Sequence, residues 1–528
     1  MKKNVFLSVS LALLLTLVSC GNTSVVTSDA ASTDSTSQPV QEETIIEKEE
    51  TEMDDIFELT KGYKTRGNTN PIMTQAFGAD PFALVVGDEV YIYMTADAYE
   101  YDAKGEIKEN SYSQIRTIHV VSTKDFKNFT DHGEIPVAGS NGLAKWAHNS
   151  WAPAAAMKNI DGKDKFFLYF ADNGGGIGVL EADSPAGPFR DPIGKALIDR
   201  KVPTCAEVLW LFDPAVLVDD DGSAYIYFGG GVPQGKEEFP GTARVAKLGD
   251  DMVSLATDPV AIDAPCLFED SGIHKYNDKY YYSYCTNWTV SPESTQKYGF
   301  TNGEIAYMMS DSPMGPFTYT GKVLENPGTA CGLYGNNHHA IFEFKGHQYI
   351  VYHSRCLEKH MGIEKGYRST FINELITNAD GTIKLVRQSK EGIEQLFTKD
   401  AYEVNSSVCV SQMVGTDSVP FDSSLGYVDM VLGEINTGDF TETTGVDFSD
   451  VSPKSLTITA KADTGVKGSV YVRIDFPNKS NICKIDVEGT GEFTEYTADL
   501  REEITGVHFV YFVFYGEGFE VKDWKFNK

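Results

Sequence analysis

The sequence predicts an all-β protein in which a five-bladed β-propeller is followed by a β-sandwich of the jelly-roll type. Aromatic residues are abundant, at 12% of the chain, and helical periodicity is scarce. One pattern recurs five times at intervals of roughly 55 to 75 residues, which suits four-stranded propeller blades with long loops. At 528 residues the chain exceeds what one core usually holds, so more than one domain is expected.

The recurring pattern is a β-hairpin with a polar group at its mouth. In its clearest copy, Asp213 precedes Pro214, an apolar run covers 215–218, an acidic turn covers 219–222, and an aromatic run covers 225–228. The other four copies begin at Gly78, Trp151, Phe268 and Asn336.

Residues at the hairpin mouths are expected to meet. The innermost strand of every propeller blade runs along the central axis, so these residues converge although they are distant in sequence. Asp80, Asp213 and Glu269 should therefore share one pocket. Capping of a turn would explain any single Asp-Pro pair, but three acids at the same phase of three copies favour a joint role.

Three carboxyl groups in one pocket suit the hydrolysis of a glycosidic bond. That reaction needs an acid that protonates the leaving oxygen and a base that activates water. Glu269 follows Leu267 and Phe268, and this apolar setting would raise its pKa, as a general acid requires. Asp80 is the candidate general base. Asp213 is expected to orient Glu269 and to keep its pKa high through like charge.

Further candidates for substrate contact lie in the same hairpins. Trp151 and Phe228 are placed where a sugar ring could stack on an aromatic face, although core packing would explain either residue alone. Asn337 and His338 head the fifth copy and should face the axis. A histidine at the mouth of an acidic pocket can be a ligand or simply a hydrogen-bond partner.

The N-terminus predicts export. Lys2-Lys3, an apolar run over 5–18 and the sequence Leu17-Val18-Ser19-Cys20 resemble a bacterial lipoprotein signal over residues 1–20, with lipid on the Cys20 sulfur. An ordinary signal or a membrane helix is the alternative. Residues 21–58 are rich in Ser, Thr and Glu and are predicted to be a disordered tether. We therefore expect a lipoprotein at the cell surface that contacts the membrane only through its lipid.

The net charge limits the class of partner. A formal charge of -31 argues against nucleic acid, because the two would repel each other. A neutral polysaccharide is compatible with this charge. Solubility of an exported protein would explain the charge equally well.

Seven cysteines follow Cys20. Their number is odd and no C-x-x-C pair occurs, so neither a full disulfide framework nor a zinc site is indicated. Most are expected to be small buried hydrophobic residues. One or two bridges, for instance between Cys409 and Cys483, stay open.

Two folded units are predicted, a propeller over 59–398 and a sandwich over 399–528. In the second unit, residues 456–460, 470–474 and 509–514 alternate or run as strands between turns rich in Gly and Asp. About 125 residues of this kind suggest a β-sandwich.

The motifs of the predicted propeller resemble those of glycoside hydrolase family 43 and, within it, the group that acts on arabinoxylan. They lie between about Asn70 and Arg387. They are Gly78-Ala79-Asp80-Pro81, Trp151-Ala152-Pro153, residues 210–222, Phe268-Glu269-Asp270-Ser271-Gly272-Ile273 and Gly335-Asn336-Asn337-His338-His339-Ala340. The resemblance implies an inverting propeller enzyme with Asp80 as general base, Glu269 as general acid and Asp213 as the residue that modulates the acid.

The same resemblance implies two further roles. Arg368 resembles the arginine that reaches into the pocket, although a surface salt bridge would also explain it. His338 matches a histidine near a metal or water site on the axis, so a structural calcium ion is expected there. No cofactor is expected to take part in the chemistry.

The last unit resembles carbohydrate-binding module family 6. The resemblance rests on Ala401-Tyr402-Glu403, on Gly438-Asp439-Phe440 with Gly445-Val446-Asp447-Phe448, and on residues 512–514 with Val521-Lys522-Asp523-Trp524. Glu403 and Asp523 fit the positions where such modules hold a structural calcium ion. Tyr427, Phe440 and Trp524 could stack on sugars or fill the core.

Together these patterns predict a hydrolase that removes terminal α-L-arabinofuranosyl branches from arabinoxylan by single displacement with inversion. β-Xylosidase and endo-xylanase activities stay open, because loops 97–113 and 291–302 decide between a pocket and a groove. A non-catalytic surface lipoprotein that binds glycans is the alternative from another class, but it would not need all three acids.

Overall fold

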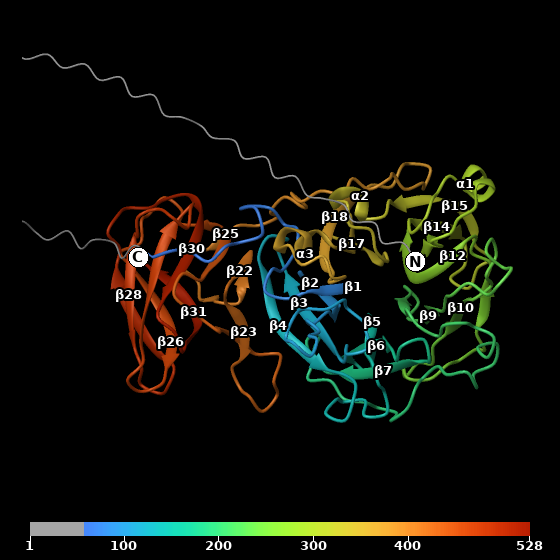
Figure 1. Ribbon diagram of the computed structural model, residues 1–528, viewed down its shortest axis with the longest axis horizontal. Coiled ribbons are helices and arrows are strands. Elements are labelled where there is room, and N and C mark those ends of the chain that lie inside the picture. Colours follow the sequence, from blue (N-terminus) through green and yellow to red (C-terminus); the bar gives the residue numbers. More distant parts are fainter. Residues whose placement is uncertain (1–56) are drawn as a thin grey trace, which may run out of the picture. The chain divides into compact units, whose positions relative to one another are not determined.

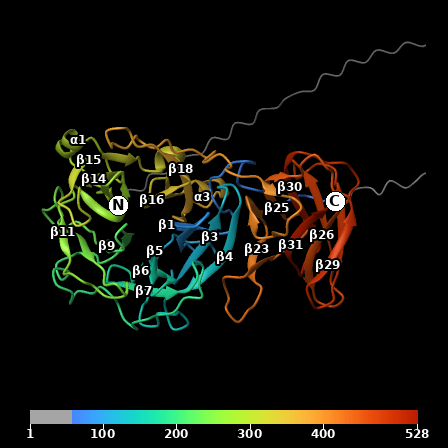
Figure 2. The same cartoon turned by 180° about the vertical axis from the view of Figure 1, so that it is seen from behind.

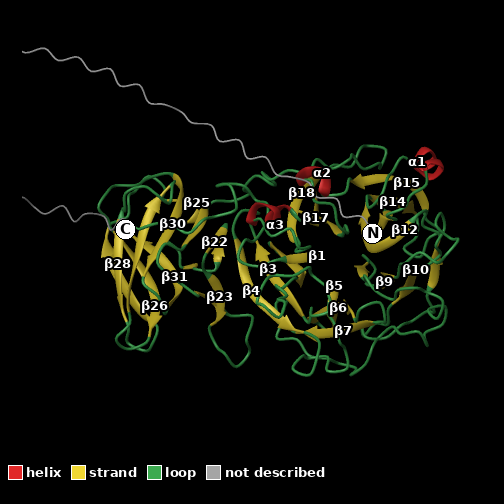
Figure 3. Cartoon of the chain, viewed as in Figure 1, coloured by secondary structure: helices red, strands yellow, loops and turns green. Residues whose placement is uncertain are grey.

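The computed structural model describes residues 57–528, which belong to one compact unit. The predicted signal segment, Cys20 and most of the predicted tether lie outside the described residues. Strands dominate the described chain, and its helices are short segments between strands (Figure 3). Among these residues, no helix has the length and apolar character that a membrane crossing requires.

Five antiparallel sheets follow one another along the first part of this unit (Figures 1 and 2). The first contains β1 (Gly78–Val86), β2 (Glu89–Ala96), β3 (Thr117–Thr123) and β4 (Phe129–Pro136). The second contains β5 (Trp151–Ile160), β6 (Lys163–Ala171) and β7 (Ile177–Ala182). The third contains β8 (Ala215–Val218), β9 (Ala224–Phe228), β10 (Ala243–Lys247) and β11 (Val260–Ile262). The fourth contains β12 (Leu267–Tyr276), β13 (Lys279–Thr286), β14 (Ile305–Ser310) and β15 (Thr318–Leu324), and the fifth β16 (His339–Phe344), β17 (His347–Ser354) and β18 (Ser369–Leu375).

The five sheets close into a propeller. Their first strands contact one another in the order β1, β5, β8, β12, β16 and back to β1, so these strands surround a common axis. Hydrophobic clusters fill the space between neighbouring blades. Phe82 of β1 packs against four of these clusters and so fills the axis below the strand ends. The predicted five-bladed propeller is confirmed.

The hairpins that head the blades form where the turn sequences predicted them. Positive φ angles at both central residues define two-residue turns at Asp161-Gly162, Asn277-Asp278 and Lys345-Gly346. This conformation matches the right-handed twist of the paired strands. The turn residues thereby set the register that places each strand end at the axis.

Two further sheets form the predicted sandwich. One contains β19 (Lys399–Asp400), β22 (Gln412–Val414), β25 (Phe440–Asp447), β27 (Lys467–Ile474), β28 (Cys483–Glu488) and β30 (Val507–Tyr515). The other contains β20 (Asn405–Ser406), β23 (Asp417–Pro420), β24 (Met430–Gly433), β26 (Ser455–Ala462), β29 (Thr494–Asp499) and β31 (Phe519–Asn527). Residues such as Ile458, Val470, Phe512 and Trp524 join in one core. The sandwich prediction is therefore confirmed.

The sandwich segment also packs on the first blade. β21 (Cys409–Val410) pairs with β4 and extends that sheet. The Tyr427 hydroxyl accepts a hydrogen bond from the Phe189 backbone N–H at 2.9 Å. Tyr427, Phe440 and Trp524 are all buried, so they fill the interior rather than offer rings to a sugar.

The seven cysteines from Cys205 to Cys483 are free thiols. The bridge considered between Cys409 and Cys483 does not occur. The Cys409 sulfur accepts a hydrogen bond from Lys399, whereas the Cys483 thiol lies 3.7 Å from the Ala498 carbonyl oxygen. Five of the seven are buried, as predicted for most of them, and only Cys331 and Cys409 are partly exposed.

Candidate active site

A small cavity of about 210 Å³ lies where the first strands of the blades begin. The structure places the three predicted carboxylates in it together. Its lining residues are Asp80, Tyr112, Ile115, Trp151, Phe212, Asp213, Glu269, Asn336, His338 and Arg368.

Strained backbone at the strand ends aims these side chains into the cavity. Asp80, Ala152 and Asp213 each precede a proline and have positive φ angles of 46°, 41° and 49°. This conformation costs a non-glycine residue about 1–3 kcal/mol and persists where packing imposes it. In β1 and β5 the pairing register also shifts at this point, as in a β-bulge. The repeated distortion turns successive side chains toward the axis.

The register corrects one prediction, namely that the three acids occupy the same phase. Asp80 and Asp213 lie at the positive-φ position of their blades, whereas in β12 that position is held by Asp270, with φ 67°. Glu269 lies one residue earlier, at the position that Trp151 and Phe212 occupy in other blades. The longer glutamate side chain therefore enters the cavity from a different point of the strand end.

An arginine with two carboxylate partners holds Asp80. Arg368 donates from Nη1 to Asp80 Oδ1 at 2.8 Å, and from Nε and Nη2 to Asp97 at 2.9 and 2.8 Å. Both ion pairs are buried, and the Tyr112 ring lies 4.7 Å from the guanidinium carbon. A bidentate, buried pair of this kind fixes the orientation of the arginine. A surface salt bridge is therefore not the role of Arg368.

Arg368 and two histidines together set the ionisation of Asp80. Burial is the largest single effect and would raise the pKa of this carboxyl group. The Arg368 charge, the contact with His353 and the charges of His338 and His353 together outweigh burial, so the pKa lies well below its usual range. The Asp80 backbone N–H also donates to His353 Nδ1 at 3.0 Å, and His353 Nε2 lies 2.8 Å from the Asn336 carbonyl oxygen. These partners therefore favour the carboxylate form of Asp80.

The surroundings of Glu269 shift its pKa in the opposite direction from that of Asp80. Burial raises its pKa well above the usual value, and the charges of Asp213 and Asp80 raise it further. Burial and the charge of Asp80 also raise the pKa of Asp213, whose Oδ2 accepts the Asp270 backbone N–H at 3.0 Å. Glu269 Oε1 is buried and has no hydrogen-bond partner. Burial and like charge therefore favour a proton on the Glu269–Asp213 pair, whereas the partners of Asp80 favour its ionised form.

A buried histidine and aspartate network supports the floor of the cavity. His338 Nδ1 lies 3.7 Å from Asp80 Oδ1 and 3.9 Å from Asp213 Oδ2, and its Nε2 lies 3.1 Å from Asp270 Oδ1. Asp270 Oδ2 also contacts His339 Nδ1 at 2.6 Å. His338 therefore links the carboxylates of three blades.

Comparison with known proteins identifies the family. The model for glycosyl hydrolases family 43 matches residues 68–383, and that for carbohydrate binding module (family 6) matches residues 410–528. The chain belongs to glycosyl hydrolase family 43. The β-sandwich that follows the propeller is a family 6 carbohydrate-binding module.

Similar proteins extend over most of this family 43 chain. An arabinoxylan arabinofuranohydrolase of Paenibacillus polymyxa is 47% identical over 469 residues, which is 86% of this chain and 73% of that protein. Another, of Bacillus subtilis strain 168, is 44% identical over 485 residues, 88% of this chain and 93% of that protein. The crystal structure of a family 43 arabinoxylan arabinofuranohydrolase from Bacillus subtilis, in complex with cellotetraose, superimposes with a TM-score of 0.82 at 43% identity and covers 88% of this chain and 98% of its own.

Two predicted contact residues of the family 43 domain lie elsewhere. Phe228 is fully buried in the core between the second and third blades, because the two-residue period of β9 puts it on the same face as Ile226. Asn337 is also fully buried, and its Nδ2 donates to the Gly303 carbonyl oxygen at 3.0 Å. Their neighbours in space and sequence, Phe212 and Asn336, line the cavity instead.

Other cavity residues carried weaker signals in the sequence. Trp151, His338 and Arg368 line the cavity as predicted contacts. Asp97 and Asp270 were not predicted. The pairing of the strands shows that Asp270 holds the position in its blade that Asp80 holds in the first blade. Asp97 has no comparable signal, because its partner Arg368 is 271 residues away.

The described residues give no support to the predicted calcium positions. No group of three or more His, Cys, Asp and Glu side chains in the described chain is arranged to hold a metal ion. His338 Nε2 lies within hydrogen-bond distance of Asp270, and Glu403 is exposed, before β20, while Asp523 lies on β31. Calcium stays a prediction at both positions, and no catalytic step is assigned to it.

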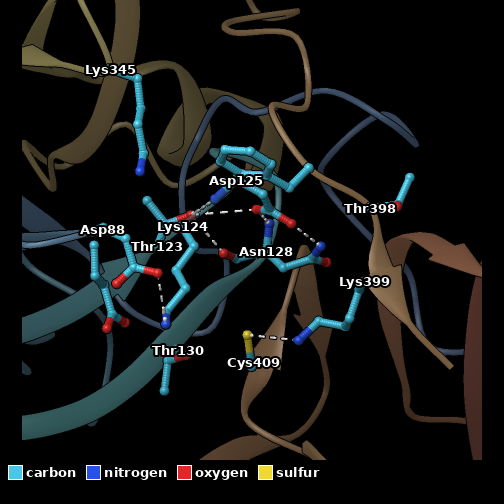
Figure 4. A pocket seen from close by; sticks show the side chains of 12 residues that line it. Asp88, Thr123, Lys124, Asp125, Asn128, Thr130, Lys345, Thr398, Lys399 and Cys409 are labelled. Atoms are coloured by element: carbon cyan, nitrogen blue, oxygen red, sulfur yellow. Dashed lines mark hydrogen bonds and ion pairs between the residues drawn. The ribbon is translucent and has the colours of Figure 1, made fainter. Parts of the chain in front are cut away.

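A larger cavity, of about 460 Å³, lies between the first blade and the start of the sandwich (Figure 4). Its charged groups have partners within the wall. Asp125 accepts the Lys127 and Asn128 backbone N–H groups at 2.8 Å each, and Lys124 pairs with Asp88 at 3.4 Å. The smaller cavity instead gathers three buried carboxyl groups from three blades, so it is the candidate active site.

Proposed function

We propose that this family 43 glycosidase releases terminal α-L-arabinofuranosyl branches from arabinoxylan with inversion of configuration. The observation that carries the proposal is the pair Asp80 and Glu269, which are buried in one cavity with pKa values shifted in opposite directions. Glycoside hydrolysis by inversion needs one ionised and one protonated carboxyl group. The names of two relatives that are 44% and 47% identical support the substrate.

In this proposal Glu269 is the general acid. Its unpartnered oxygen is free to donate the retained proton to the oxygen that leaves with the xylan chain. The charge of Asp213 keeps the pKa of Glu269 high. The proton is returned from solvent after the product leaves.

Asp80 is the general base in the same proposal. Arg368 occupies its Oδ1, and within the described chain no hydrogen bond is donated to Oδ2. This oxygen can accept a proton from a water molecule that attacks the anomeric carbon on the face opposite Glu269. Trp151, Phe212 and His338 are proposed to contact the sugar ring.

The size of the cavity supports removal of a single sugar. Its volume, about 210 Å³, is below the roughly 300 Å³ at which pockets for larger ligands begin. An endo-acting enzyme would need an open groove for several backbone sugars. The Trp210 ring contacts both Phe212 and Phe268, at ring-centroid distances of 5.3 Å each. These three aromatic residues are proposed to meet the xylan chain.

Product analysis on arabinoxylan tests the proposal. Arabinose alone, first formed as the anomer opposite to that of the substrate in proton NMR, is the expected result. Release of xylose or of short xylan chains would favour the xylosidase or xylanase alternatives. Retention of configuration would contradict the mechanism, and binding without release in the wild-type protein would favour a glycan-binding protein.

We further propose that the chain is exported and lipid-anchored at Cys20. The motif at residues 17–20 and the polar segment that follows support this proposal. Metabolic labelling with a fatty acid in a bacterial host is expected to mark the wild-type protein and not Cys20→Ala. Equal labelling of both would contradict the assignment.

A further inference from the structure

Two thiols lie in contact beside the fifth blade, outside the catalytic cavity. Cys331 ends α2 (Gly328–Cys331), and Cys356 begins α3 (Cys356–Met361). Their side chains are within hydrogen-bond contact, and both pack against the hydrophobic cluster between the fourth and fifth blades. α2 contacts α3, and Lys359 of α3 donates a hydrogen bond to the Cys331 carbonyl oxygen. Backbone and side-chain contacts therefore both hold the two thiols together.

The two thiols differ in reactivity. Cys331 is partly exposed and Cys356 is buried. The hydrogen bond from the Cys356 thiol and, to a smaller extent, the nearby Lys359 ammonium lower the pKa of Cys331 to about 6, although burial acts in the opposite direction. The more accessible sulfur is thus the thiolate near neutral pH, and the thiolate is the form that attacks a disulfide.

The other described cysteines lack such a partner. Cys205, Cys266, Cys285 and Cys483 are buried, and burial raises the pKa of each thiol. Cys409 is partly exposed, but its sulfur is hydrogen-bonded to Lys399 at 3.3 Å. Within residues 57–528, Cys331 and Cys356 are the pair in which two thiols contact each other.

We propose that Cys331 and Cys356 form an intrachain disulfide by exchange with an oxidised dithiol protein or a small-molecule disulfide. The Cys331 thiolate attacks one sulfur of the oxidant, a mixed disulfide forms, and the other sulfur leaves as a thiolate. Cys356 then loses its proton and attacks the Cys331 sulfur, which releases the second oxidant sulfur. The protein loses two electrons and two protons, and the oxidant gains them as two thiols.

The bridge would join two segments that support the cavity. Residues 332–355, which it would enclose, contain Asn336 and His338 of the cavity wall and His353, which accepts the Asp80 backbone N–H. On the α3 side, Glu358 Oε2 accepts the backbone N–H groups of Lys365, Gly366 and Tyr367, the three residues before Arg368. A covalent link between α2 and α3 is therefore expected to stabilise the catalytic cavity against local opening.

Mass spectrometry of the full chain tests the proposal independently of the substrate. The protein is incubated with oxidised glutathione, quenched with an alkylating agent and digested with trypsin without reduction. The expected product is a disulfide between peptide 323–345, which contains Cys331, and peptide 356–359, which contains Cys356. The melting temperature is expected to rise by a few degrees and to fall again with dithiothreitol.

Matched variants decide the outcome. Cys331→Ser and Cys356→Ala should each abolish both the linked peptide and the reversible rise in melting temperature. Cys409→Ser, which removes the other partly exposed thiol, should retain both. Full alkylation of Cys331 and Cys356 after oxidation, or a glutathione adduct on Cys331 with no linked peptide, would overturn the proposal.

Discussion

The two sides of the catalytic cavity contain buried carboxyl groups whose pKa values are shifted in opposite directions. Asp80 lies against Arg368, whose charge, together with His353 and His338, outweighs the effect of burial. Glu269 lies beside Asp213 and has an oxygen with no partner, so burial and like charge act in the same direction. Burial alone therefore does not separate base from acid in this protein. The positively charged and hydrogen-bonding partners on one side do, and Arg368 contributes most among them.

The largest expected effect is the loss of the proton donor. Glu269→Gln should lower kcat/KM on arabinoxylan by about 10²–10⁴. An aryl arabinofuranoside with a good leaving group needs little protonation, so the same variant should lose far less activity on it. The two substrates are compared in initial-rate assays. Equal losses on both substrates would show that Glu269 is not the acid.

Loss of the general base Asp80 should lower activity on both substrates. Asp80→Asn removes the base, and attack by water is needed whatever the leaving group. A loss of about 10²–10⁴ is therefore expected on both arabinoxylan and the aryl substrate. Circular dichroism and the melting temperature serve as the control for folding. Near-normal activity of a folded Asp80→Asn protein on either substrate would contradict its role.

Removing the cation should make the two sides more alike. In Arg368→Gln the pKa of Asp80 rises, because the largest of the effects that oppose burial is removed. The rate requires ionised Asp80, so the acidic limb of the pH profile of kcat/KM should move to higher pH, with a rate loss of about 10-fold or more at the optimum. Asp97→Asn, which leaves the cation but removes its other partner, should move the limb less. An unchanged acidic limb in Arg368→Gln would show that this limb does not report the ionisation of Asp80.

Removing the like charge should act on the opposite limb. Asp213→Asn takes away a group that raises the pKa of Glu269. The rate requires protonated Glu269, so the alkaline limb should move to lower pH. The acidic limb should move little. A shift of the alkaline limb to higher pH would contradict the assigned role of Asp213.

The smallest effect is expected at the apolar wall. Phe212→Ala should raise KM several-fold, because Phe212 lines the cavity. The matched control is Phe228→Ala, which should cost about 3–5 kcal/mol in the free energy of unfolding because the ring is in the core. Its KM should be unchanged at a temperature where it is folded. A raised KM in Phe228→Ala but not in Phe212→Ala would support the prediction that Phe228 contacts the sugar.

The sequence allowed the fold to be predicted because each blade begins with a local signal. Turn pairs such as Asp161-Gly162 specify two-residue hairpins, and the repeat of these hairpins indicates a propeller. The meeting of Asp80, Asp213 and Glu269 followed from that topology. The side chains that face the axis were thus predictable where the beginning of a blade carried an acid.

The errors have physical causes that short patterns do not contain. A shift in strand register moves Glu269 one position from Asp80, and this shift becomes visible only when the strands are paired. Phe228 was misplaced because propeller strands pack against blades on both faces, so an aromatic residue need not point to the axis. The Asp97–Arg368 pair joins residues too distant in sequence for any local pattern.

Infrared difference spectroscopy near pH 6 tests most directly whether the two sides of the cavity differ in protonation. The spectrum of wild-type protein is compared with those of Glu269→Gln and Asp80→Asn, and the signal of interest is the C=O stretch of a protonated carboxyl group. We expect this band in the wild type, its loss or weakening in Glu269→Gln, and no loss in Asp80→Asn. Absence of the band from the wild type, or its loss in Asp80→Asn instead, would contradict the account.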